Sequence, residues 1–199
     1  MNSPRSITKY FALCLFTLLS AACVSQMQPA QQAIDAINNA VANAKDAPKY
    51  IPDQVATVQS GLAALNASFA KQDYAAVVAA APAVLAEANG LAAAAEVKRD
   101  QVKAAMIAEF NGLSETMPRL MDSVKTRLDA LSKTHRVPKG VDLATAKSDF
   151  SDASAQWTSA QSTYASGTIE DALASAKGAK SKFEAAAAAL KLDLSKAAG

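Results

Sequence analysis

The side chains that most often carry catalysis or bind metals are scarce in this chain of 199 residues. His135 is the only histidine and sits beside Arg136 in a polar stretch, so neither a His-based triad nor a His-rich metal site is supported. Motifs for phosphate, dinucleotide, calcium-loop or covalent haem binding are absent, and no carboxylate pair stands out for acid–base work. We therefore expect a protein that is not an enzyme, with no catalytic, cofactor-binding or metal-binding residues.

Three methionines, Met106, Met117 and Met121, are the remaining candidates for chemistry. Met117 and Met121 lie one helical turn apart, and thioether sulfur is a ligand that suits copper. Methionines at helical spacing within a leucine-rich seam, however, usually fill gaps in a hydrophobic core. We interpret all three as core residues.

The first 22 residues have the pattern of a secretory signal peptide. Arg5 and Lys9 give a short positive region, and residues 10–22 then run without a charge. A permanent membrane-spanning helix needs roughly 20 apolar residues, more than this run supplies before polar residues return. We predict that residues 1–22 are a signal peptide, that residues 23–28 form a tether, and that the mature protein is exported.

The end of this signal, Leu19-Ser20-Ala21-Ala22-Cys23, resembles the bacterial lipobox, in which a peptidase cuts before a cysteine that becomes acylated. The resemblance implies a lipid on Cys23. The residue that follows, Val24 rather than aspartate, implies transfer to the outer membrane, facing the periplasm. The alternative is ordinary cleavage after Ala22, because Ser20 and Ala22 also fit the small-x-small rule, and the product would then be soluble in the periplasm. Cys14 lies inside the signal, so the mature chain has no partner cysteine for an internal disulfide.

The mature chain is electrically balanced. The full sequence holds 20 Lys and Arg against 18 Asp and Glu, and Arg5 and Lys9 are the only charges before Cys23, which leaves 18 of each sign. The net positive charge of the full sequence therefore belongs to the signal, and no nucleic-acid-binding surface is predicted.

Alanine-rich seams predict an all-α fold. From Asp53, apolar residues recur at a spacing of three and four up to Phe69, and a second seam starts at Tyr74 after an Asp73 that is suited to cap a helix. The same layout appears 95 residues later, with a break at residues 166–168 and Trp157 in the middle of the first seam. We predict an antiparallel bundle of duplicated αα-hairpins, with Trp157 in the core.

A long segment joins the two hairpins. A helix over residues 29–47 is expected to cover the first hairpin, whose second helix has no strong break before Gly112 and can continue to residue 133. Pro118 would kink this central helix or start a new one. The domain prediction is therefore residues 29–134 for the first hairpin with the central helix, 135–141 for a linker, and 142–199 for the second hairpin.

The segments 50–53, 70–74 and 137–142, together with Trp157, resemble proteobacterial lipoproteins built from Ala-rich helical hairpins, and the turns faintly resemble those of tetratricopeptide repeats. This resemblance implies fold and address only. We expect a non-enzymatic envelope scaffold or protein-interaction module, attached to the membrane by its lipid, that contacts another envelope protein. The alternative is a soluble periplasmic binder of a small apolar or lipid ligand. A heptad-based oligomer is also open, although the prolines and glycines disfavour one continuous rod.

Overall fold

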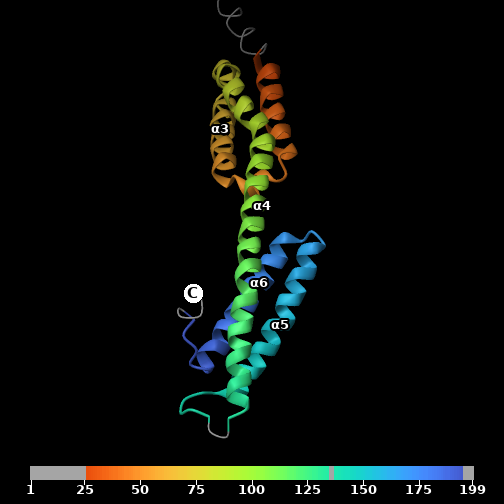
Figure 1. Ribbon diagram of the computed structural model, residues 1–199. Coiled ribbons are helices and arrows are strands. Elements are labelled where there is room, and N and C mark those ends of the chain that lie inside the picture. The colour runs from red at the N-terminus through yellow and green to blue at the C-terminus, as the bar shows by residue number, and fades with distance from the viewer. Residues whose placement is uncertain (1–25, 135–136, 195–199) are drawn as a thin grey trace, which may run out of the picture. The chain divides into compact units, whose positions relative to one another are not determined.

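The computed structural model describes residues 26–134 and 137–194, and these residues form helices and no strands, which confirms the all-α prediction (Figure 1). The helices are residues 26–43, α2 (Ala47–Tyr50), α3 (Pro52–Ala70), α4 (Tyr74–Ser132), α5 (Leu143–Ala165) and α6 (Ile169–Ala189). Contacts divide the chain into two compact units that meet within α4, at Asp100 and Gln101.

Helix α4 runs for 59 residues without a break through Gly90, Gly112 and Pro118. No new helix begins at Pro118, which was one of the two outcomes the sequence left open. A proline removes one backbone hydrogen bond and crowds the preceding turn. Here the helix is held on both sides of the proline, because Met117 before it and Val124 after it are fully buried in the core of unit 2.

Unit 1, up to residue 100, is a three-helix bundle of the 26–43 helix, α3 and the first part of α4. Its core is apolar and draws residues from all three helices. The fully or almost fully buried members include Ala30, Ile34, Ile37, Val58, Leu65, Val77, Ala81, Leu91 and Ala95. The sequence predicted one helix over residues 29–47, whereas the first helix ends at 43 and α2 starts at Ala47. Pro48 explains this break, because its fixed backbone angle suits the first turn of a helix.

Unit 2, from residue 101, packs the remainder of α4 against α5 and α6. Helices α5 and α6 meet through fully buried alanines, among them Ala153, Ala160, Ala172 and Ala176. Small residues at these positions let the two helix axes approach closely. Trp157 is 5% exposed and stacks on Phe110 of α4, with ring centroids 5.8 Å apart, which confirms its place in the core.

The α3–α4 and α5–α6 turns share one conformation at the predicted offset of 95 residues. Each turn contains one residue with positive φ, which is Gln72 (62°) in the first turn and Gly167 (91°) in the second. The N–H of this residue donates to the carbonyl of the residue three positions earlier in the chain. The N–H of the following residue donates to the carbonyl of the residue five positions before itself. Buried positions also correspond: Val58 with Ala153, Leu65 with Ala160, Val77 with Ala172, Ala81 with Ala176, Ala88 with Phe183, Leu91 with Ala186 and Ala95 with Leu190. The same cap also ends α6 at Lys191, where no second hairpin helix follows within the described residues. A shared cap therefore does not require that the two hairpins arose by duplication, and internal duplication stays a prediction.

The division of the chain differs from the one expected. The sequence predicted a boundary in the linker 135–141, but the last 32 residues of α4 pack with α5 and α6, so the units meet inside a helix instead. Periodicity shows which residues of α4 face a core. It does not show which neighbouring helices provide that core.

Candidate functional site

Of the sequence-predicted candidates for chemistry, the structure describes only the three methionines. Cys23 and His135 lie outside the described residues. Met117 is fully buried in unit 2, and Met106 and Met121 pack against the same cluster, as expected of core residues. Within residues 26–134 and 137–194, no three His, Cys, Asp or Glu side chains gather as metal ligands, and no buried side-chain nitrogen or oxygen is left without a hydrogen bond.

A cluster of four charged side chains lies on unit 1, around Arg99 of α4. Its guanidinium lies 3.5 Å from the carboxylate of Asp46, 3.3 Å from that of Glu96 and 3.3 Å from that of Asp100. The hydrogen bond and the negative charge of Asp100 raise the pKa of Arg99 above its ordinary value. All four side chains are well exposed, so the cluster links the turn before α2 to α4 and contributes little to stability.

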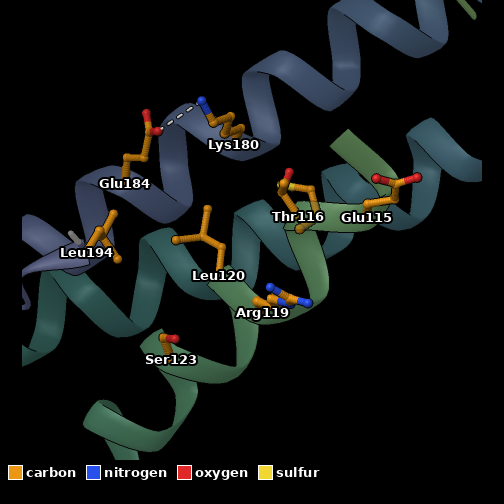
Figure 2. A pocket seen from close by; sticks show the side chains of 9 residues that line it. Glu115, Thr116, Arg119, Leu120, Ser123, Lys180, Glu184 and Leu194 are labelled. Atoms are coloured by element: carbon orange, nitrogen blue, oxygen red, sulfur yellow. Dashed lines mark ion pairs between the residues drawn. The ribbon is translucent and has the colours of Figure 1, made fainter. Parts of the chain in front are cut away.

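A groove on unit 2 is the first surface that could hold a ligand. Its volume is about 430 Å³, and α4, α6 and Leu194 line it. Figure 2 shows Leu120 extending from α4 toward α6, where Lys180 and Glu184 form an ion pair of 3.2 Å. The buried Met117 also contributes to the lining, and Arg119 stands at its edge. The groove thus combines apolar residues with two cationic side chains, Arg119 and Lys180, and two carboxylates, Glu115 and Glu184.

The outward side of α4 in unit 1 is the second candidate surface. Seven exposed residues spaced by three, four or seven positions form this alanine face: Ala75, Ala79, Ala83, Ala86, Gly90, Ala93 and Val97. At a rise of 1.5 Å per residue the face is about 33 Å long. None of its members is charged, and every side chain except that of Val97 is as small as a methyl group or a hydrogen atom.

A shallow groove borders the alanine face. It lies between α3 and α4, has a volume of about 410 Å³, and is lined in part by Thr57, Val58, Ala86, Gly90 and Ala94. Nothing lies within 4 Å of the position that a Cβ on Gly90 would take, so the helix surface is open there. Gln54 and Glu87 also line the groove, so the face presents an uncharged strip, bordered by one carboxylate, on which a further helix could lie.

One stretch of helix α4 has the length and apolar composition of a membrane-spanning helix. In the described part of the chain it is long enough, and apolar enough over one stretch, to cross a bilayer by length and composition alone, with 22% of that stretch buried. The buried side chains of its first part belong to the three-helix core of unit 1. We interpret this stretch as a bundle helix whose outer side is left uncovered.

Sequence reasoning missed the alanine face, although a signal for it was present. Between Asp73 and Glu96 the chain carries one charge, Glu87, so both the inner and the outer side of this helix are almost free of charge. An amphipathic helix that faces water carries polar residues on its outer side. The lack of them was the informative feature.

The chain was also compared with known proteins. No protein-family model, no curated protein and no solved structure matches it.

Proposed function

We propose that this protein is a non-enzymatic lipoprotein of the bacterial cell envelope that docks a helical segment of another envelope protein on the alanine face of α4. The observation that carries the proposal is the composition of that face. It is uncharged and exposed, and it extends over about 33 Å. Exposed apolar strips of this extent on soluble domains mark contacts with proteins or membranes.

The small side chains of the alanine face determine what can bind there. Alanines and a glycine four residues apart, as at Ala75, Ala79 and Ala83 and at Ala86 and Gly90, let a second backbone approach to the short end of the 8–10 Å range for packed helices. The α5–α6 pair in unit 2 already uses buried alanines in this way. A helical partner with larger residues on its contact side would therefore fit this strip.

The proposed address rests on the sequence before the described residues. The signal-peptide pattern over residues 1–22, the lipobox-like Leu19–Cys23 segment and Val24 support acylation of Cys23 and attachment to the outer membrane, facing the periplasm. The resemblance to proteobacterial Ala-rich lipoproteins supports the same address. Export would leave only Cys23 in the mature chain, and acylation would use its thiol.

Site-specific photocrosslinking in living cells tests the docking proposal. A photoreactive amino acid replaces Ala86 on the alanine face in one strain. In the control strain it replaces Ala92, an exposed alanine of the same helix that lines a different groove. The proposal expects one discrete envelope protein to be captured from Ala86 and not from Ala92. Equal capture from both sites, or capture from neither, would contradict it, and a crosslink to a second copy would replace the partner with self-association.

A second candidate function is supported by the groove of unit 2. Its volume of about 430 Å³ and its apolar base suit a small apolar or lipid ligand, whose polar end would meet the charged side chains of Arg119 and of the Lys180–Glu184 ion pair. Mass spectrometry of an organic extract of the purified protein tests this function. Amphiphile present in the wild type and lost from an Arg119→Glu, Lys180→Glu variant would support it, whereas an empty wild-type protein would count against it.

A further inference from the structure

One end of unit 1 must lie close to the proposed lipid anchor, because few residues separate the two. The described helix begins at residue 26, three residues after Cys23. Three residues span at most about 10 Å even when fully extended. If Cys23 carries its lipid in the bilayer, the start of the 26–43 helix lies at the membrane surface.

The α3–α4 turn lies at the same end of unit 1. The 26–43 helix and α3 are similar in length and are joined by a short connection, so the end of α3 returns to the level where the first helix begins (Figure 1). We call this end of unit 1 the tip, and define it as the first turn of the 26–43 helix, the last turn of α3, the turn 71–73 and the start of α4. The lipid and the tip would therefore meet the same surface.

The tip exposes large apolar side chains. Met27 is 48% exposed and Val78 is 37% exposed, and they are two of four exposed large hydrophobic residues in the described chain. Phe69 at the end of α3 and Tyr74 at the start of α4 are half-buried against the core of unit 1 and pack edge to face, with ring centroids 5.1 Å apart. Val78 lies four residues, or about 6 Å along the helix axis, from the start of α4 at Tyr74. This depth matches the 5–10 Å by which interfacial helices enter a bilayer.

The charges at the tip are few and compatible with the headgroup layer. Lys71 is exposed in the turn and can meet lipid phosphates. The carboxylate of Asp73 accepts the backbone N–H of Ala76 at 3.2 Å, so it caps α4 rather than projecting beyond the end. Asp35, the next carboxylate on the 26–43 helix, lies nine residues, or about 13 Å, from its described start. Tyrosine near the headgroups is also a typical interfacial residue.

We propose that the tip is a second membrane contact, in which Met27, Phe69, Tyr74 and Val78 enter the interfacial layer of the same bilayer that holds the lipid on Cys23. This inference rests on the proposed lipid anchor. Two contacts instead of one would stop unit 1 from swinging freely about its tether. They would also hold the alanine face, which begins at the tip with Ala75, at a fixed angle to the membrane.

A fluorophore at Val78 tests this contact. The full-length protein is produced in a bacterium, purified with its processed amino terminus, and reconstituted in vesicles of phosphatidylethanolamine and phosphatidylglycerol. Val78→Cys or Val97→Cys supplies a thiol for an environment-sensitive dye. Val97 is the matched control, because it is a valine of the same helix, 59% exposed, 19 residues further from the tip. Mass spectrometry of the amino-terminal peptide reports separately on the lipid.

The expected result is an acylated Cys23, a blue-shifted emission on reconstitution at position 78, and protection of that dye from aqueous iodide, with no change at position 97. Acylation with both dyes equally open to iodide would overturn the tip contact and leave the anchor in place. An unmodified Cys23 would overturn the anchor, and the tip contact that rests on it, whatever the dyes report, because its free thiol would also take the dye in both variants.

Discussion

Replacement of Gly112 by alanine tests whether α4 is one continuous helix. Gly112 lies in the interior of α4, and nothing lies within 4 Å of the Cβ that an alanine would add. Glycine in a helix interior is about 0.8–1.0 kcal/mol less favourable than alanine, because it loses more backbone entropy on folding. With no clash to offset this gain, Gly112→Ala is expected to raise the free energy of unfolding of unit 2 by about 0.8–1.0 kcal/mol.

The assay follows urea unfolding through Trp157, the only tryptophan in the chain, which lies in unit 2. Gly61→Ala is a contrasting variant, followed by far-UV circular dichroism, since Gly61 lies in unit 1. Its Cβ would come within 2.9 Å of Val84 Cγ2, and a β-branched side chain in a helix cannot turn away easily. A smaller gain or a loss is expected there. Destabilisation by Gly112→Ala would refute the reasoning, because it would mean that the helix is interrupted at this glycine.

Three further outcomes follow from the packing and the caps. Trp157→Ala is expected to lower the free energy of unfolding of unit 2 by about 3–5 kcal/mol, measured by circular dichroism, since it removes a large side chain that is 5% exposed. Gly167→Ala, at φ +91°, is expected to cost about 1–2 kcal/mol, and a neutral result in the same assay would argue against this turn. The hydrogen bonds that Asp142 accepts from the N–H and hydroxyl of Thr145 lower the pKa of its carboxyl group. Their stabilisation is therefore present above the ordinary aspartate pKa and lost as the pH falls below about 4, so Asp142→Asn should flatten that acid dependence in unfolding titrations.

Much of the local structure followed from the sequence because it depends on short-range patterns. The two hairpin turns lie where the seams are interrupted, and Asp73 caps α4 through the N–H of Ala76 as expected. Trp157 is in the core because a large apolar residue in the middle of a seam has no other stable place.

The features that the sequence left open depend on long-range packing. Whether Pro118 interrupts α4 depends on the burial of Met117 before it and Val124 after it. Which alanines of α4 are exposed depends on which helices cover it, and alanine fits a core and a surface equally well. The groove of unit 2 likewise needs α4 and α6 side by side, which periodicity alone does not predict.

The most direct test of the proposed envelope lipoprotein is mass spectrometry of the amino-terminal peptide of the protein isolated from a bacterial host. The proposal predicts a chain that begins at Cys23 and carries a diacylglyceryl group on its sulfur, with the signal peptide removed. It also predicts that this protein sediments with the outer membrane and that a Cys23→Ser variant does not. A processed chain with an unmodified Cys23 that is released with the soluble periplasmic fraction would contradict it.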